Sequence, residues 1–500
     1  MWGTLPTTLA SVAASSKRVT RFLTVALIAL TWIFVVLLTV PRAISRGVAD
    51  YGFFTGMAER LRAGDTLYIE VWDNKDPLVF YTLAIARNLG PNGVIGAWIL
   101  EISWVLMAAI ALYVIARFQS VQRPLAAYLG FGLGPLVILG IAYFMGSTHL
   151  PAIALILAGV ALIYSRHPLT AGIALGVVPV IKLVMTPMAV VLAVVVLFGL
   201  RRRSDIRWIA LGFASVLVAM SVILMLRGEL TGFIETQIHN VLYSQSPIVT
   251  AEQAGIVEKI KQHIVILVNP NVAAVEFTIT VILAVTAPWW RRSQAANSFT
   301  APLWWLTAAG FGIAIGTIAV TGKWFHHAQA FYVPAALALV LLGAWLVQAT
   351  KWRSVLVGAI CAVATYPLAG LPQPGIYVDA VRDLPDRWAQ ATSTDTLTSI
   401  LRDLEPASIS FIGETVPQSP GLEEWTIACR HIAQRPFNPE QIFTETLECL
   451  PSSEVIVAPQ NLESTSTFPA FDEFRAGVRS ILDEGFRCEE VSTFLICDSR

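Results

Sequence analysis

The most informative stretch for the fold runs from Gly47 to Tyr81 and reads GVADYGFFTGMAERLRAGDTLYIEVWDNKDPLVFY. It holds six carboxylates together with basic and aromatic side chains, and it directly follows an apolar segment near 22–40. Ionisable side chains are rare inside membrane spans. The stretch therefore indicates a loop at a membrane surface, and its interpretation depends on what the rest of the chain is.

The composition of the whole chain indicates a polytopic α-helical membrane protein. Of its 500 residues, 55% are hydrophobic and only 14% are charged, and the mean hydropathy is +0.65. A soluble domain usually has about 25% charged residues. About 20 consecutive apolar residues are enough for a helix to cross a bilayer, and many windows of this sequence exceed that length.

Hydropathy predicts eleven membrane-spanning helices. The first has a basic flank but no small-residue cleavage site, so we interpret it as an uncleaved anchor rather than a signal peptide. The fifth and sixth are short, which is typical of tilted or broken helices. The expected spans lie near residues 22–40, 93–117, 124–143, 150–165, 169–182, 184–199, 206–226, 272–290, 301–321, 328–349 and 354–370.

The basic residues of the short loops orient the chain, because Lys and Arg favour the cytoplasmic side. With a cytoplasmic N-terminus, basic clusters such as 201–207 and 291–292 lie in inner loops. Of the 13 Asp and Glu residues before residue 371, only Asp205 then falls in an inner loop. An odd number of spans places the C-terminal part outside the cytoplasm. We expect a plasma-membrane protein, although one of the endoplasmic reticulum would look similar.

The sequence predicts two domains, a membrane domain over residues 1–370 and an extracytoplasmic domain over 371–500. The second contains 9 Arg, no Lys and 21 Asp plus Glu, a balance of −12. This charge argues against a nucleic-acid partner, which needs a basic face. The runs SISFIGE, EVIVAP and STFLIC predict strands, and DEFRAGVRSILDEGF predicts an amphipathic helix ended by Gly485. A small α/β domain is expected.

Cysteine usage fits this topology. Cys361 lies within an expected span, whereas Cys429, Cys449, Cys488 and Cys497 all lie in the C-terminal domain. An even number of cysteines in an oxidising compartment predicts two disulfides. Pairing each cysteine with its neighbour in sequence is the simplest of three arrangements, and the sequence does not choose among them.

Two outer segments are expected, over residues 41–92 and 227–271. In the first, residues 51–63 have helical spacing with Asp50 at the capping position, and this helix can lie flat on the membrane surface. A carboxylate at that depth can remove a proton from an incoming hydroxyl group. A nearby ammonium group such as that of Lys75 can balance a lipid-linked phosphate.

The first outer segment resembles the first outer loop of GT-C fold glycosyltransferases, in the branch of protein O-mannosyltransferases and the lipid A aminoarabinose transferase. Bacterial members often show an acidic residue, then Gly or Tyr, then the pattern G…lY.D..d.KpPl.y. Two positions depart from it, because Asp76 replaces the usual first proline and Glu70 stands near a common Asp. The likeness rests on Asp50, Tyr51, Gly52, Gly64, Leu67, Tyr68, Asp73, Lys75, Pro77, Leu78 and Tyr81.

Three later segments carry weaker likenesses. GIALGVVPVIKLVMTPMAVV places Lys182 at the outer end of a helix, GKWFHHAQAFYVPAALAL aligns His327, and RGELTGFIETQIHNVLYSQS begins at Arg227. The resemblance implies a polyprenyl-phosphate sugar donor, Asp50 as the catalytic carboxylate, and phosphate contacts from two lysines. The expected substrate-binding residues are Tyr51, Tyr68, Asp73, Lys75, Lys182, Arg227 and His327.

Several of these residues also have an ordinary structural explanation. Asp50 can simply cap a helix, and Asp73 to Pro77 can form a turn. Lys182 can extend from a span end to the interface. His326 and His327 follow Trp324 and Phe325, a pattern typical of an interfacial aromatic belt.

The sequence therefore predicts an integral-membrane glycosyltransferase. The enzyme would transfer a sugar from a polyprenyl-phosphate carrier to an extracytoplasmic glycan, lipid or protein, with inversion if the displacement is single. A flippase or transporter of lipid-linked sugars is the alternative, although such proteins need polar sites near the midplane and often have repeated halves. A noncatalytic assembly protein leaves the charged first loop unexplained.

No cofactor is predicted. His239 and His263 are further outer histidines, so a divalent metal is conceivable, but no ligand spacing such as HExxH supports one. The expected partners are the donor lipid, the acceptor and the bilayer.

Overall fold

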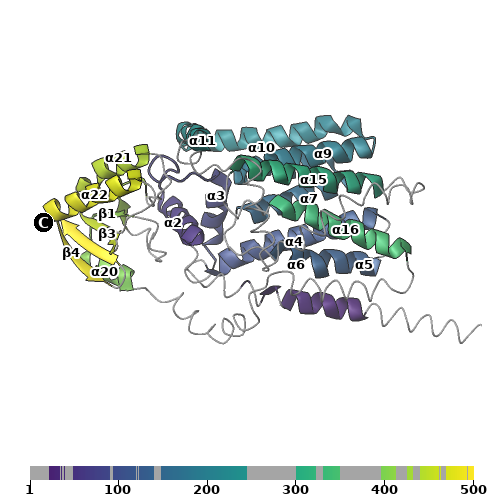
Figure 1. Ribbon diagram of the computed structural model, residues 1–500, viewed down its shortest axis with the longest axis horizontal. Helices are drawn as coiled ribbons and strands as arrows, with labels where there is room; N and C mark the ends of the chain where they lie inside the picture. The colour runs from purple at the N-terminus through teal and green to yellow at the C-terminus, as the bar shows by residue number, and fades with distance from the viewer. Residues whose placement is uncertain are drawn as a thin grey trace, which may run out of the picture.

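The computed structural model describes a helical bundle with a smaller α/β domain at one end (Figure 1). The expected spans 272–290 and 354–370, the helical pattern near 252–267 and His327 lie outside the described residues. The described residues are 22–33, 35–36, 39, 49–89, 94–119, 121, 123–139, 148–244, 300–321, 330–349, 396–412, 425–431, 440–460, 462, 469–491 and 494–499.

The bundle consists of apolar helices that coincide with the expected spans within the described ranges. The expected span near 124–143 is not a single regular helix. Its described part, residues 123–139, consists of two α-helices with a π-helical turn between them. The elements are α4 (Val94–Phe118), α5 (Arg123–Ala127), η2 (π, Tyr128–Leu133), α6 (Gly134–Leu139), α7 (His149–Tyr164), α8 (Pro168–Ile181), η3 (3₁₀, Leu183–Met185), α9 (Thr186–Gly199), η4 (3₁₀, Arg203–Asp205), α10 (Ile206–Leu226), α11 (Leu230–Ser244), α15 (Thr300–Thr321) and α16 (Tyr332–Ala349).

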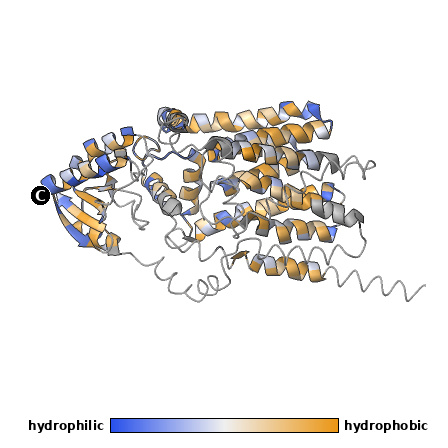
Figure 2. Ribbon diagram, viewed as in Figure 1, coloured by the Kyte–Doolittle hydropathy of each residue, from blue (hydrophilic) through white to orange (hydrophobic). Residues whose placement is uncertain are grey.

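Two stretches of the described chain, Ile95–Phe118 and Arg203–Leu226, are long and apolar enough to cross a membrane. Shorter apolar helices accompany them, and the bundle is predominantly hydrophobic (Figure 2). On α10, large apolar side chains such as Leu211 and Val218 are exposed, as expected of a surface that faces lipid. The total of eleven spans stays a prediction.

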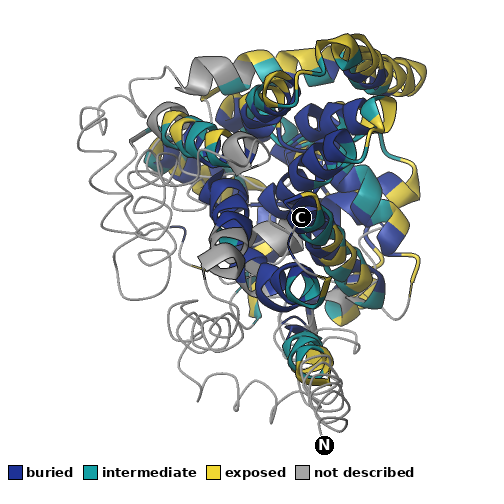
Figure 3. Ribbon diagram, turned by 90° about the vertical axis from the view of Figure 1, so that its right-hand side faces the viewer, coloured by how far each residue is buried: buried dark blue, intermediate teal, exposed yellow. Residues whose placement is uncertain are grey.

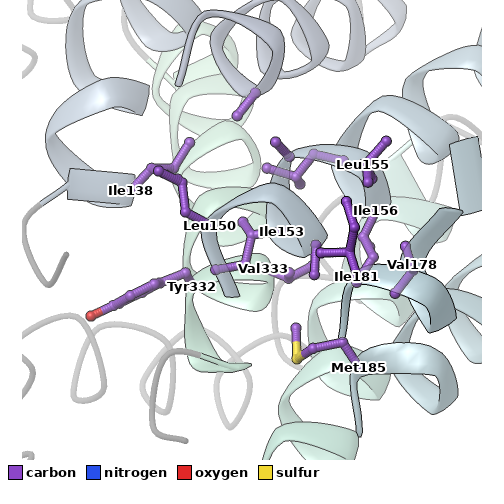
Figure 4. Packing of buried hydrophobic residues seen from close by; sticks show 14 of the residues in the cluster. Ile138, Leu150, Ile153, Leu155, Ile156, Val178, Ile181, Met185, Tyr332 and Val333 are labelled. Carbon is purple, nitrogen blue, oxygen red and sulfur yellow. The ribbon is translucent and has the colours of Figure 1, made fainter. Parts of the chain in front are cut away.

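The bundle is held together by close helix packing. Buried residues gather where the helices face one another, and exposed residues lie on the outer helices (Figure 3). Aliphatic side chains from α6, α7, α8 and α16 meet around Ile153, Ile181 and Val333 (Figure 4). Helices α8 and α10 approach so closely that a Cβ on Gly172 would lie 2.2 Å from the Ile209 carbonyl oxygen.

Helices α8 and α9 are separated by a break at Lys182. This residue has an extended backbone, with φ −157° and ψ 86°, and the 3₁₀ turn η3 follows it. Pro179 lies inside α8, and Pro187 occupies the first turn of α9, where the missing amide hydrogen is tolerated. The break brings the end of α8 close to the first outer loop.

Residues 49–89, the described part of the segment expected to form the first outer loop, contain two helices, α2 (Ala49–Ala63) and α3 (Pro77–Ala86), which lie between the bundle and the α/β domain (Figure 1). We keep the name first outer loop for this segment. Helix α3 was not predicted from the sequence. Helix α2 begins at Ala49, so Asp50 lies within its first turn rather than at the expected capping position. Its apolar residues do not lie on the membrane surface, because Phe54 and Met57 are buried against protein, and the Phe54 ring packs edge-on against Phe80.

The α/β domain contains a five-stranded mixed sheet in the order β2-β1-β3-β5-β4. Strand β1 is parallel to β2 and β3, and β5 is antiparallel to β3 and β4. The sequence predicted the three inner strands and α22, but neither edge strand, β2 or β4. The elements are α20 (Thr396–Leu404), β1 (Ser408–Phe411), β2 (Thr426–Ile427), α21 (Glu440–Cys449), η7 (Leu450–Ser452), β3 (Val455–Pro459), α22 (Pro469–Gly485), β4 (Phe486–Val491) and β5 (Phe494–Ser499).

Two disulfides reinforce this domain. Cys429 is bonded to Cys449, and Cys488 is bonded to Cys497 within the β4–β5 hairpin. The first links the segment after β2 to the end of α21.

Candidate functional site

The core of the site is a tight turn in the first outer loop between α2 and α3. Tyr68 has φ 68°, a left-handed conformation that is unfavourable for a bulky residue. Its amide donates to the Val71 carbonyl at 2.6 Å, and its hydroxyl donates to the Lys75 carbonyl at 2.7 Å. The buried Tyr68 ring thus connects the turn to the segment that carries the candidate lysine. Burial and neighbouring carboxylates raise the pKa of Tyr68 well above its usual value, so the hydroxyl stays protonated.

Residues 73–76 form the polar segment that leads into α3. The buried Asp73 carboxylate accepts the Lys75 amide at 2.7 Å, a local bond typical of an Asx turn. The Lys75 ammonium group donates to the Asn74 side chain at 2.7 Å. From α11, Asn240 donates its side-chain amide to the Asn74 carbonyl at 3.0 Å. The backbone of this segment is therefore fixed from two sides.

Asp76 joins this segment to the helix break at Lys182. Its carboxylate accepts the Leu183 amide at 2.9 Å across a separation of 107 residues. Asp76 and Lys182 are both buried, at 7% and 8% exposure. Burial raises the pKa of Asp76 to about 6, against the opposing effects of the Leu183 amide, Lys182 and Lys75. Two lysines from distant parts of the chain thus act on one carboxylate.

Glu229 supports the loop from the other side and is fully buried. Its Oε1 accepts the Leu67 amide at 2.9 Å and Nε of Arg227 at 2.8 Å. Its Oε2 accepts the Tyr81 hydroxyl, which ties the loop to α3. Arg227 also donates to the Asp65 carbonyl at 3.0 Å and lies 5.5 Å from the Tyr81 ring centroid.

The structure brings together part of the predicted site. Tyr68, Asp73, Lys75 and Lys182 form one cluster around Asp76, and Arg227 joins it through the Glu229 bonds. The backbones of Asp50 and Tyr51 lie in the first turn of α2, and their side chains belong to the undescribed part. Among the described residues, no three His, Cys, Asp or Glu side chains meet as metal ligands would.

Sequence reasoning missed the two carboxylates that organise the cluster. The sequence marks Asp76 as one of the loop carboxylates, as part of a possible turn and as a departure from a family pattern, but not as the residue that connects the loop to Lys182. Glu229 is not among the predicted site residues. The cue for Asp76 was its position directly before Pro77, since a proline in the first helical turn predicts a helix start. The sequence around Glu229 shows only Arg227 as a possible partner, because its other two partners are 148 and 162 residues away.

Chemically, the cluster can receive an anion. The ammonium groups of Lys182, which is buried, and Lys75, which is partly buried, both act on the Asp76 carboxylate. This carboxylate has a raised pKa and can take up a proton. Lysine is a common point-charge partner of phosphate in proteins.

Comparison with known proteins gives a structural match. No protein-family model and no curated protein matches the chain. The fold is similar to the crystal structure of ArnT from Cupriavidus metallidurans bound to undecaprenyl phosphate, with a TM-score of 0.53 and 13% sequence identity. The match covers 95% of this chain and 97% of that one. The chain therefore has a GT-C-like fold, that of a polytopic and mostly helical membrane protein.

Proposed function

We propose that this protein is an integral-membrane glycosyltransferase. It transfers a sugar from a polyprenyl-phosphate carrier to an acceptor on the extracytoplasmic side of the membrane. The observation that carries the proposal is the cluster of Lys75 and Lys182 around Asp76, where the start of α3 meets the end of α8. The likeness in fold to a protein bound to undecaprenyl phosphate supports the same ligand class.

In the proposed reaction, the acceptor hydroxyl attacks the anomeric carbon while the bond from that carbon to the phosphate oxygen breaks. The polyprenyl phosphate leaves with the electron pair, and Lys75 and Lys182 stabilise its charge. Asp50 receives the hydroxyl proton as general base. One displacement of this kind inverts the anomeric configuration.

The remaining predicted residues have supporting roles in this proposal. Tyr68 and Asp73 fix the backbone of Lys75 through the bonds described above. Arg227 positions the loop through Glu229. Tyr51 and His327 stay candidate substrate contacts, and the α/β domain contributes to acceptor binding.

The test is mass analysis of products after incubation of the purified, reconstituted protein with a panel of polyprenyl-phosphate sugars and candidate acceptors. Formation of a product with the added sugar mass supports a transferase. Absence of any product across the panel, with donor lipid moved between leaflets instead, would overturn the proposal.

The residue-level test is Asp50→Asn, with Glu70→Gln on the same loop as control. Loss of a general base typically costs about 10²- to 10⁴-fold in rate, so we expect kcat to fall by at least about 100-fold for Asp50→Asn. Glu70 is exposed and bonds to Thr66 rather than to the lysines, so Glu70→Gln should keep most activity. Unchanged kcat in properly folded Asp50→Asn protein would remove Asp50 from the mechanism.

A further inference from the structure

The α/β domain contacts the first outer loop at two residues, Trp72 and Arg60. The Trp72 amide donates to the Arg430 carbonyl at 2.9 Å, and the Trp72 ring packs edge-on against His431, with centroids 5.2 Å apart. A second contact comes from α2, where the buried Arg60 guanidinium donates to the Trp425 carbonyl. All three partners belong to residues 425–431, which we call the docking segment.

The docking segment is itself fixed to helix α21. The Cys429–Cys449 disulfide joins it to the last residue of that helix. One turn earlier, Glu445 accepts Nε of Arg430 at 3.0 Å and lies 2.7 Å from Nε2 of the buried His431. Burial alone would raise the pKa of Glu445, but the hydrogen bonds from His431, Arg430 and Gln441 lower it to about 2. The carboxylate therefore keeps its charge at any physiological pH.

Trp72 directly precedes the segment that contains Asp73, Lys75 and Asp76. Trp72 is followed by Asp73, whose carboxylate fixes the Lys75 amide. The Trp72 indole also donates to Thr236 of α11 at 2.9 Å, so the ring lies between the bundle and the α/β domain. A displacement of the docking segment would be passed through Trp72 to Lys75 within three residues.

The second disulfide lies elsewhere in the same domain. Cys488 and Cys497 pair across β4 and β5, at the sheet edge opposite β2. The two hydrogen bonds and the ring contact described above join the loop to the docking segment rather than to that hairpin. The Cys488–Cys497 disulfide is therefore a matched control for the effect of removing the Cys429–Cys449 disulfide.

We propose that the α/β domain positions the donor-binding loop through Trp72, and that this positioning requires the Cys429–Cys449 disulfide but not Cys488–Cys497. The link to donor binding rests on the proposed function, whereas the docking itself does not. Trp72 and His431 are positioning residues that act through Lys75. Reduction of one disulfide outside the membrane domain is thereby coupled to the site.

The direct test is hydrogen exchange of the full-length protein in lipid nanodiscs. We compare the double variant Cys429→Ser/Cys449→Ser with Cys488→Ser/Cys497→Ser. Peptides that contain the Trp72 amide should exchange at least about tenfold faster in the first variant only, because a local opening exposes that amide. Peptides from β3 should keep their protection, which shows that the domain stays folded. Equal exchange at Trp72 in both variants would overturn the proposal.

Kinetics separate loop positioning from acceptor binding. The Cys429→Ser/Cys449→Ser variant should raise the donor KM by about tenfold and leave the acceptor KM within about twofold, since misplacement of a binding group is costly. Trp72→Ala should likewise raise the donor KM and leave the acceptor KM nearly unchanged. Trp72→Phe should raise the donor KM less, because an aromatic ring against His431 is kept. A change in acceptor KM alone would contradict the proposal. If the wild type transfers no sugar, the proposed function fails while the exchange result still decides the docking.

Discussion

At the scale of single residues, Asp76 is the group whose charge should respond to the donor. A polyprenyl-phosphate sugar is a phosphodiester and does not titrate near neutral pH. An anion placed beside Lys75 and Lys182 would raise the pKa of Asp76 above its value of about 6. Anion binding is then linked to proton uptake, so the donor should bind more tightly as the pH falls.

We therefore expect the donor KM of the wild type to decrease by about threefold to tenfold between pH 7.5 and pH 5.5. In Asp76→Asn this pH dependence should disappear, because the amide carries no charge but can still accept the Leu183 amide. Steady-state kinetics across this range provide the measurement. An equal slope in both proteins would mean that another group titrates.

Glu229 is the residue on which the stability of the first loop should depend most. Its removal by Glu229→Ala leaves Arg227, the Leu67 amide and the Tyr81 hydroxyl without their shared acceptor. Breaking such a buried pair costs about 3–5 kcal/mol, so the midpoint of thermal unfolding in nanodiscs should fall clearly. Glu70→Gln is the matched control, since Glu70 is exposed and bonds only locally to Thr66; we expect a change below about 0.5 kcal/mol. Equal effects would show that burial of Glu229 is unimportant.

The sequence indicated the residue types of the site but not the arrangement. Lys75, Lys182 and Asp73 were identified from a loop pattern and a helix end, and they lie in one cluster. What brings them together is the bond between Asp76 and the Leu183 amide. Such a contact depends on tertiary packing, and neither residue has a local pattern that would predict the other.

At the scale of elements, the spacing between α8 and α10 is set by glycines. A Cβ on Gly172 would lie 2.2 Å from the Ile209 carbonyl oxygen, which is backbone and cannot move aside cheaply. Gly172→Ala should therefore separate the helices and destabilise the protein by about 1–3 kcal/mol.

Gly312→Ala on α15 is the matched control for this prediction. A Cβ there meets nothing within 4 Å, and alanine is favoured over glycine in a helix by about 1 kcal/mol. We expect unchanged or higher stability. Thermal unfolding of the two variants in the same nanodiscs makes the comparison, and a similar loss in both would contradict the packing argument.

Helices were more predictable than strands for a physical reason. A long apolar run is a strong signal, and α4, α7, α8, α9 and α10 agree with the expected spans to within two or three residues. The short edge strand β2 has two residues and is specified by pairing with β1 rather than by its own sequence. Helix α3 was missed because its ten mostly apolar residues follow a charged loop and are too few to indicate a span.

At the scale of the whole molecule, the first outer loop and the α/β domain should be accessible from the same side of the membrane. Variants with one free cysteine can test this in a background that lacks Cys361 and keeps both disulfides, with Glu70→Cys on the loop and Glu484→Cys on the domain, both exposed positions. An impermeant maleimide added to intact cells should label both. Arg203→Cys, exposed between α9 and α10, should react only after permeabilisation. Labelling of only one outer position would contradict the fold.

The hydrogen bond between Trp72 and Arg430 also limits how many times the chain can cross the membrane between these two residues. Because both residues must stand on one face of the bilayer, the polypeptide between them has to traverse it an even number of times. Ten of the eleven predicted crossings fall in that interval, which satisfies this requirement. A variant with one additional hydrophobic helix inserted between α11 and α15 would cross the membrane an odd number of times between Trp72 and Arg430. Its α/β domain would then lie on the opposite side of the membrane from the first outer loop.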